Sequence, residues 1–164
     1  MAADLRTIRL DQPIPPDFRI EQVGDGDTLT DFERGHSAVY NMPLSETEAT
    51  FNSVLAGGFD PSFPQLLYVG YFRGAPVTTS MMFLGAGVAG IYAVATVPEA
   101  RKHGFGAAMT LAPLRRASEL GCRIGILTAS EMGLSIYRRI GFRDYCKMSF
   151  FEFSATSTSK PMRS

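Results

Sequence analysis

The segment best suited to chemistry in this sequence is short, basic and rich in glycine. It joins an apolar, β-prone run to an Ala-, Met- and Leu-rich run with helical spacing. The free N–H groups and the dipole at the start of a helix favour an anion, and glycine lets the backbone approach that anion closely. The segment therefore predicts a cradle for a phosphate group, formed by the backbone of Arg101, Lys102, His103, Gly104, Phe105 and Gly106.

The side chains of this segment add positive charge to the predicted cradle, since the first three residues are basic. The alternative interpretation is a glycine-containing loop with solvated basic residues. Two other phosphate sites are excluded by spacing. The sequence has no G-x-x-x-x-G-K-[ST] of a P-loop, and its glycines are too few and come too late for a dinucleotide site.

The length and composition of the chain are those of a single domain with a hydrophobic core. The chain has 164 residues, of which 45% are hydrophobic, and its formal net charge is zero. A balanced charge argues against a nucleic-acid partner. The N-terminus lacks the apolar stretch of a signal peptide, and no apolar run is long enough for a membrane span. We therefore expect a cytoplasmic protein without nucleic-acid or membrane partners.

The two cysteines, Cys122 and Cys146, do not form a C-x-x-C pair. Both lie in strand-like surroundings, so the sequence gives no support for a metal site or a thioredoxin motif. We expect two reduced, partly buried thiols and no bound metal.

The hydrophobic pattern predicts a mixed α/β fold. A strand over 18–23 is followed by two helices, the first capped by Asp27 or Thr28 and the second by Ser45. Three strands over 65–72, 76–84 and 88–97 form an antiparallel meander. A helix over 104–120, which contains Pro113, then leads to a strand over 122–129 by a crossover, so these last two strands should be parallel.

The chain is predicted to end with a helix over 131–140 and an edge strand or hairpin over 142–153. The domain organisation follows from these elements. Residues 1–17 form an N-terminal arm or short leading strand, residues 18–153 form a single domain, and residues 154–164 form a low-complexity tail that we expect to be disordered.

Two motifs together resemble those of the GNAT superfamily of N-acetyltransferases. The first surrounds the basic loop and resembles the acetyl-CoA signature of that family: Thr96-x-Pro98-x-x-Arg101-x-x-Gly104-x-Gly106. The second resembles a later helical motif: Ser130-x-x-Gly133-x-x-Ile136-Tyr137-x-x-Ile140-Gly141-Phe142. The order of elements agrees as well, so the resemblance covers roughly residues 18–153.

The resemblance implies how the co-substrate, acetyl-CoA, binds. The two central parallel strands should splay apart into a V. The backbone near Val94 and Thr96 should pair with the pantetheine arm, and the amides of residues 101–106 should hold the pyrophosphate. Many relatives have Asn at the position of Ser130, which contacts the CoA arm. Ser130 would either do so more weakly or only cap the helix.

The resemblance also assigns a catalytic residue. Tyr137 matches the position whose phenol protonates the departing CoA thiolate, and an ordinary tyrosine is protonated at neutral pH. The alternative is an amphipathic core residue. Histone-acetylating relatives carry a glutamate base where this chain has Gly90, so that base is absent. His36 has a suitable ordinary pKa for a base, but a lone His on a helix is more often structural.

The leading hypothesis is thus an acetyl-CoA-dependent N-acetyltransferase acting on a small amine or an exposed protein amino group. The second is a non-catalytic acyl-CoA-binding sensor of the same fold. Several apolar residues are candidates for an acceptor pocket, although most should be core: Phe32, Tyr40, Met42, Tyr71, Met81, Phe83 and Tyr92. The aromatic segment 149–153 could pair across a homodimer or pack in the core.

Overall fold

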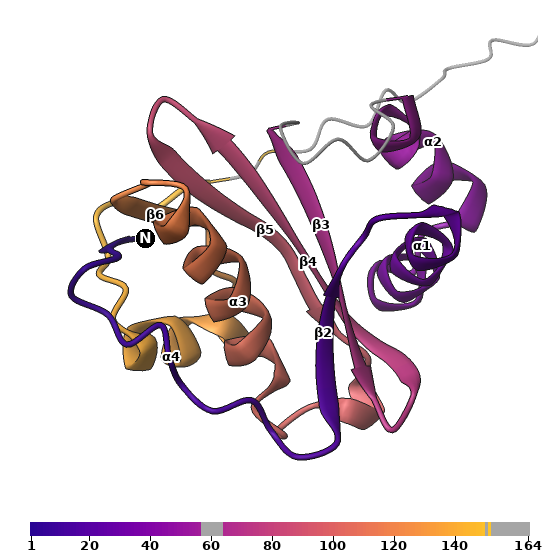
Figure 1. The fold of residues 1–164 in the computed structure, drawn as a ribbon, viewed down its shortest axis with the longest axis horizontal. Helices are drawn as coiled ribbons and strands as arrows, with labels where there is room; N and C mark the ends of the chain where they lie inside the picture. The colour runs from indigo at the N-terminus through magenta and orange to yellow at the C-terminus, as the bar shows by residue number, and fades with distance from the viewer. Residues whose placement is uncertain (57–63, 150, 152–164) are drawn as a thin grey trace, which may run out of the picture.

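The protein is described by a computed structural model that covers residues 1–56, 64–149 and 151. A six-stranded sheet in the order β1-β6-β5-β4-β3-β2 lies between two pairs of helices (Figure 1). Helices α1 (Gly26–Tyr40) and α2 (Leu44–Ala56) cover one face, and α3 (Phe105–Glu119) and α4 (Glu131–Ile140) cover the other. The predicted α/β class is confirmed.

The meander is formed by β2 (Phe18–Gln22), β3 (Gln65–Phe72), β4 (Ala75–Gly85) and β5 (Val88–Thr96), each antiparallel to the next. A short 3₁₀ turn, Pro98–Ala100, leads from β5 towards α3. Helix α3 crosses back over the sheet to β6 (Ile124–Leu127), which pairs parallel to β5. The predicted meander and crossover are therefore both observed; short glycine turns between apolar, β-prone runs favour antiparallel hairpins.

The far edge of β6 is occupied by the N-terminus of the chain. Strand β1 (Ala2–Asp4) pairs antiparallel to β6, with Ala3 opposite Gly125. The α-amino group of Met1 also donates a hydrogen bond of 2.7 Å to the Leu127 carbonyl. The leading segment is therefore a short strand of the sheet, followed by an irregular stretch that runs to β2.

The prediction of a closing strand or hairpin over 142–153 is wrong for the residues that the structure describes. Arg143 makes a single antiparallel bridge with Ala2, and the residues from 144 to 149 form no strand. Strand β6 has two edges, which β5 and β1 already occupy, so the C-terminal segment has no free edge there. Cys146 lies in this segment and is exposed rather than partly buried. The predicted tail, 154–164, lies outside the described residues.

Two hydrophobic clusters hold the layers together. Beneath α3, the buried side chains include Phe105, Met109 and Leu114. Beneath α1 and α2, they include Phe32, Phe51 and Val69. Each face of the central strands is thus covered, which explains their nearly continuous apolar sequences.

The helix starts differ slightly from the predicted ones. Asp25, rather than Asp27 or Thr28, caps α1: its side chain accepts a hydrogen bond of 2.8 Å from the Thr28 amide. Helix α2 begins at Leu44, so Ser45 lies inside the helix and does not cap it. In the part of the chain that the structure describes, no helix is long and apolar enough to cross a membrane.

Candidate functional site

The two central parallel strands pair only over the first part of β5, because β6 ends at Leu127. Their pairing runs from Val88 opposite Ile124 to Ile91 opposite Leu127, and β5 then continues alone on this side as far as Thr96. Beyond Ile91, one edge of the β5 backbone has no strand partner and is open to a ligand. This arrangement is the V-shaped opening that the sequence resemblance implied.

A β-bulge bends β5 just beyond the point where β6 leaves it. The register with β4 shifts between Thr79 and Met81, which places Ala93 and Val94 opposite Ser80. Ala93 has a φ of 49°, a left-handed conformation that non-glycine residues rarely adopt. A bulge of this kind turns backbone groups away from the ladder, so it re-aims the β5 backbone at the opening of the V.

Val94 and Thr96 both lie on the part of β5 that has lost its β6 partner. The Val94 side chain packs against the core beneath α3. The Thr96 hydroxyl donates to Thr78 Oγ1 at 3.1 Å. Their side chains are thus engaged in the protein, and any contact with a ligand in the V falls to their backbone.

The basic loop lies at the open end of the V and leads directly into α3. Lys102 and Gly104 have left-handed φ values of 68° and 84°, and Gly104 is the N-terminal cap of α3. The first turn of α3 contains no acidic residue. A Cβ atom on Gly106 would meet no heavy atom within 4 Å. This helix start is therefore open and suited to an anion, as a pyrophosphate would require.

The three basic side chains of the loop have different roles. Arg101 Nε donates to the Thr96 carbonyl at 3.1 Å, so this side chain folds back onto the end of β5. His103 Nδ1 lies 2.8 Å from the Arg101 carbonyl, and its ring stacks on Phe105 at 5.5 Å between centroids. Lys102 is exposed. The backbone amides therefore carry more of the predicted anion site than the side chains do.

Phe105 and Ser130 hold the helices that border the V. Phe105 is buried and stacks on Phe18 with 4.2 Å between ring centroids, which anchors the first turn of α3. Ser130 caps α4, where its Oγ accepts a hydrogen bond of 3.3 Å from the Gly133 amide. The capping role that the sequence left open for Ser130 is therefore observed.

Tyr137 projects from α4 and is half-buried against the core beneath α3. Burial raises the pKa of its hydroxyl, Tyr40 adds to the shift, and the nearby Thr110 hydroxyl opposes it. Its ring lies edge-on to Phe142, with 6.2 Å between centroids. The phenol is consequently a protonated, hydrogen-bond-donating group over the neutral pH range.

Tyr40, which adds to the rise in the pKa of Tyr137, packs against His36 on α1. Tyr40 is the last residue of α1 and is half exposed, and its ring is tilted on that of His36 at 4.4 Å. Desolvation lowers the pKa of His36, and its Nδ1 is buried without a hydrogen-bond partner among the described residues. The sequence singled out both residues, and the structure brings their two rings together.

Gly90, where the histone-acetylating relatives have a glutamate, lies beneath the ring of Tyr92. A Cβ atom at this position would be 2.6 Å from Tyr92 Cε2 and 2.7 Å from its hydroxyl. The phenol of Tyr92 thus fills the space into which a longer side chain would extend. Of the other acceptor candidates, Phe32 and Tyr71 are buried core, whereas Phe83 is exposed.

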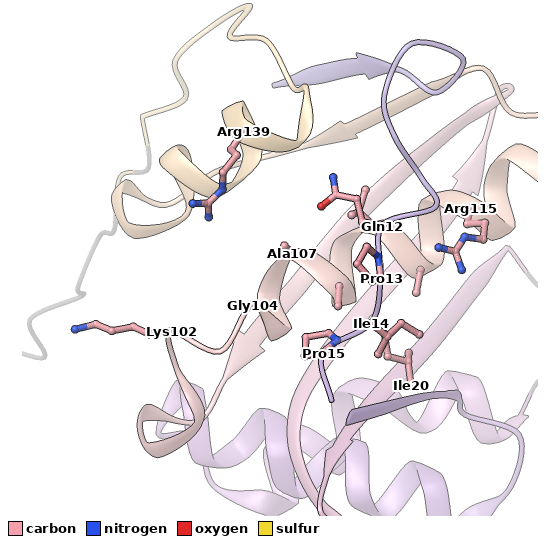
Figure 2. Close-up of a pocket in the computed structure, with 13 residues that line it drawn as sticks. Gln12, Pro13, Ile14, Pro15, Ile20, Lys102, Gly104, Ala107, Arg115 and Arg139 are labelled. Carbon is pink, nitrogen blue, oxygen red and sulfur yellow. The ribbon is translucent and has the colours of Figure 1, made fainter. Parts of the chain in front are cut away.

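A cavity lies beside the basic loop, between α3, α4 and the irregular stretch that follows β1 (Figure 2). It shares Lys102 and Gly104 with the loop, and Gln12, Arg115 and Arg139 also line it. Sequence reasoning missed these last three residues, because they come from three separate segments and no motif links them. Within the described residues, no cluster of His, Cys, Asp and Glu could hold a metal ion.

The chain was compared with known protein families and solved structures. Residues 85–144, which include β5, the basic loop, α3, β6 and α4, match the sequence model of the Acetyltransferase (GNAT) domain. No curated protein matches the chain in sequence.

Several solved structures share the fold. A GCN5-related N-acetyltransferase from Kribbella flavida superposes with a TM-score of 0.65 and 21% identity, covering 87% of this chain and 52% of its own. AAC(6')-Iy, solved with the bisubstrate analogue CoA-S-monomethyl-acetylneamine, superposes with a TM-score of 0.67 and 14% sequence identity. The match covers 84% of this chain and 99% of AAC(6')-Iy. Glucosamine-6-phosphate N-acetyltransferase from Arabidopsis thaliana superposes with a TM-score of 0.63 and 14% sequence identity. The match covers 84% of this chain and 99% of the Arabidopsis protein.

The chain therefore has the GNAT fold, and the similarity to GNAT acetyltransferases that its motifs predicted is confirmed. The reaction common to that family is acetyl transfer. The chain spans about half the length of the Kribbella protein and nearly all of the Arabidopsis one.

Proposed function

We propose that the protein is an acetyl-CoA-dependent N-acetyltransferase that acts on a primary amine by direct attack. The observation that carries this proposal is the V between β5 and β6, which has the open start of α3 at one end; Tyr137 extends from α4, on the same side of the sheet as α3. In this proposal, residues 101–106 bind the pyrophosphate and the backbone of Val94 and Thr96 binds the pantetheine arm. We place the catalytic domain in residues 18–153, to which residues 1–17 add the edge strand β1 and an irregular arm.

The reaction that we propose forms one bond and breaks another. The nitrogen of a neutral amine attacks the thioester carbonyl carbon, and the carbon–sulfur bond then breaks to release CoA. Tyr137 gives its phenolic proton to the departing thiolate, and the proton lost from the amine passes to water, from which the phenolate is reprotonated. The raised pKa of Tyr137 supports the donor role, because the phenol is then fully protonated when the thiolate forms.

The acceptor that we propose is a small amine. Two proteins of the same fold carry names or ligands of this kind, namely glucosamine-6-phosphate N-acetyltransferase and the protein bound to an acetylneamine-CoA analogue. Tyr40, Phe83 and Tyr92 expose aromatic surface that could contact such an amine. Both cysteines are free, which is consistent with the reducing conditions of the cytoplasm.

Calorimetric titration with acetyl-CoA tests the binding site. Gly106→Glu adds a carboxylate to the first turn of α3, where a side chain meets no heavy atom within 4 Å. We expect saturable binding by the wild type and at least tenfold weaker binding by this variant, at roughly 1.4 kcal/mol for each factor of ten. Gly26→Glu is the matched control, since it also adds a carboxylate in open space at the start of a helix, α1. No binding by folded wild-type protein would refute the proposal.

Tyr137→Phe separates the enzyme from the alternative, a non-catalytic acyl-CoA-binding sensor. For an enzyme that uses this phenol, the variant should bind acetyl-CoA normally and lose about 10²–10⁴-fold in kcat. The assay measures acetylation across a panel of amino sugars and other small amines. Binding of acetyl-CoA by a wild-type protein that acetylates none of them would favour the sensor.

A further inference from the structure

Three apolar side chains form an exposed surface across the middle of the sheet. Phe83 of β4 pairs with Gly90 of β5, and Gly90 pairs with Ile126 of β6. Side chains of paired residues extend to the same face, so Phe83 and Ile126 flank Gly90 there. The ring of Tyr92 lies over Gly90, since a Cβ atom on this glycine would be 2.6 Å from Tyr92 Cε2. We call Phe83, Tyr92 and Ile126 the apolar floor.

The apolar floor lies on the face of the sheet that α3 does not cover. The chain neighbours of Gly90, Ala89 and Ile91, belong to the core beneath α3. A Cβ atom on Gly125 would likewise be 2.7 Å from Leu114 of that helix. Because side chains alternate along a strand, Gly90 and the floor residues face the other way. The three floor side chains are 46%, 43% and 37% exposed, in chain order. Exposed apolar surface gathered in this way marks a binding site.

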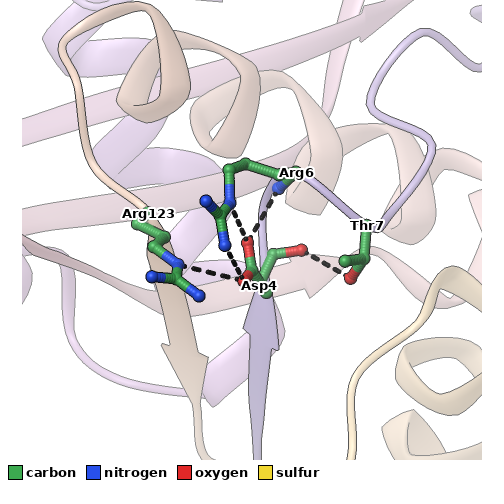
Figure 3. Close-up of polar contacts among 4 residues, drawn as sticks. All are labelled: Asp4, Arg6, Thr7 and Arg123. Atoms are coloured by element: carbon green, nitrogen blue, oxygen red, sulfur yellow. Dashed lines mark hydrogen bonds and ion pairs between the residues drawn. The ribbon is translucent and has the colours of Figure 1, made fainter.

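The β6 part of the apolar floor is held in place by the N-terminal strand. Ala2 of β1 lies opposite Ile126. Figure 3 shows the contacts that secure β1: Asp4 accepts from Arg6 Nη2 and from Arg123 Nε, each at 3.0 Å. Arg123 immediately precedes β6, so this cluster ties the two strands together. A surface that is already in place loses little conformational freedom on binding, which favours affinity.

The apolar floor adjoins the V at the point where β6 ends. Ile91 is the last residue of β5 that pairs with β6, so Tyr92 is the first one on the open edge. In the proposed function, the pyrophosphate lies on residues 101–106, and the pantetheine arm passes Thr96 and then Val94. An arm that follows this direction carries its acyl end onward to Tyr92. The thioester thus reaches the edge of the floor, where an attacking amine must be placed.

The apolar floor has the chemistry to bind a flat apolar group. Its side chains carry no charge, and those of Phe83 and Tyr92 are rings on which another ring stacks favourably. A polyhydroxylated amine on this surface would give up hydrogen bonds from several hydroxyls to water without replacing them. An aromatic ring gives up no hydrogen bond and removes apolar surface from water. The floor therefore favours an aromatic group over a sugar.

We propose that the preferred acceptor is a primary amine with an aromatic ring on a short chain, and that this ring lies on the apolar floor. Phe83 and Tyr92 then determine specificity, and Gly90 is required because a side chain there would displace the Tyr92 ring. This inference rests on the proposed function, because it takes the path of the pantetheine arm from it. It narrows the small amine of that proposal to an arylalkylamine, a choice that the shared fold alone does not make.

The test compares kcat/KM for three primary amines at saturating acetyl-CoA: 2-phenylethylamine, ethanolamine and glucosamine. The first two carry the amino group on the same two-carbon chain and differ in the ring, and the third is an amino sugar. Three variants alter the floor: Phe83→Ser, Tyr92→Ser and Gly90→Ala. The matched controls are Tyr145→Ser, at an exposed tyrosine, and Gly24→Ala, just before the cap of α1.

We expect the wild type to acetylate 2-phenylethylamine with a kcat/KM about tenfold or more above the values for the other two amines, as burial of a ring would give. Phe83→Ser and Tyr92→Ser should each lower this preference about three- to tenfold, mainly through a higher KM for 2-phenylethylamine. Gly90→Ala should also lower it, with a melting temperature near that of the wild type. All three variants should bind acetyl-CoA normally, and both controls should behave as the wild type.

A wild type that acetylates ethanolamine or glucosamine as efficiently as 2-phenylethylamine would overturn the inference and leave the proposed function standing. A preference for 2-phenylethylamine that survives in both serine variants would overturn it as well, since the ring would then lie elsewhere. Binding of acetyl-CoA without acetylation of these or any other amines would overturn both the inference and the proposed function.

Discussion

In α4, Gly133 lies one helical turn before Tyr137, and the ring of Tyr137 lies over it. A Cβ atom on Gly133 would be 2.7 Å from Tyr137 Cε2 and 3.4 Å from its Cδ2 and Cζ. Real Cβ atoms do not approach so closely, so the glycine allows the phenol to take its position. The spacing of these two residues in the sequence motif thus has a steric cause.

Gly133→Ala should displace the Tyr137 ring without unfolding the protein. Alanine is the better helix former by about 1 kcal/mol, which offsets part of the contact. We expect the melting temperature and the acetyl-CoA affinity to stay near those of the wild type, while kcat falls about tenfold or more through misplacement of the phenol. Ser135→Ala, an exposed position of the same helix, is the control. An unchanged kcat would show that the ring position does not matter.

Gly70→Ala should destabilise the fold through overpacking in the core beneath α3. The added methyl group would lie 2.5 Å from Phe18 Cζ, 2.5 Å from Thr78 Cγ2 and 2.9 Å from Met109 Sδ. Overpacking of this kind costs about 1–3 kcal/mol, which chemical denaturation would measure as a lower free energy of unfolding. Gly26→Ala, where nothing lies within 4 Å, should change that free energy by about 0.5 kcal/mol or less. Similar values for the two variants would contradict the packing seen at β3.

The buried hydroxyl of Tyr68 should make the protein less stable at alkaline pH. Its hydroxyl is buried without a hydrogen-bond partner among the described residues, and burial raises its pKa to about 12. As the pH rises, the unfolded chain releases this proton near pH 10, before the folded protein does. The contribution of Tyr68 to the free energy of unfolding is therefore complete below pH 10 and is lost as the pH rises towards 12. The free energy of unfolding should fall by about 1.4 kcal/mol per pH unit in that range from this group.

Tyr68→Phe should remove this alkaline contribution. At pH 7 the variant should be at least as stable as the wild type, since it deletes an unpaired buried hydroxyl. Urea unfolding at several pH values between 8 and 11 would measure both effects. Tyr145→Phe, at a side chain that is 74% exposed, should follow the wild-type curve. A Tyr68→Phe curve that is also parallel to the wild type would place the hydroxyl in contact with water.

Asp4→Asn should loosen the N-terminal strand. Hydrogen bonds from Arg6 and Arg123 hold the pKa of the Asp4 carboxyl well below its ordinary value. Because that pKa is depressed in the folded protein, the Asp4 carboxylate stabilises the fold above about pH 4, and this stabilisation is lost on acidification. We expect faster hydrogen exchange at the β1 amides of the variant at pH 7, and a similar increase in the wild type as the pH falls. Asp11→Asn, in the irregular stretch between β1 and β2, should leave β1 unchanged.

The sequence by itself determined the features that depend on local pattern. Short glycine turns between apolar runs predicted the meander, and helical spacing predicted α3, because each pattern depends on residues that are neighbours in the chain. The motif around Gly104 and Gly106 located the start of α3 for the same reason. The left-handed φ of Gly104 is also a local requirement of the chain.

Only the tertiary structure decided which distant segments meet. Either end of the chain could have paired with the free edge of β6; β1 occupies it, so the expected closing strand is absent from residues 144–149. The cavity that Gln12, Arg115 and Arg139 line likewise depends on elements far apart in sequence. Local propensity is the same whichever partner a segment finds, and the choice between partners is made by competition for edges and surfaces during packing.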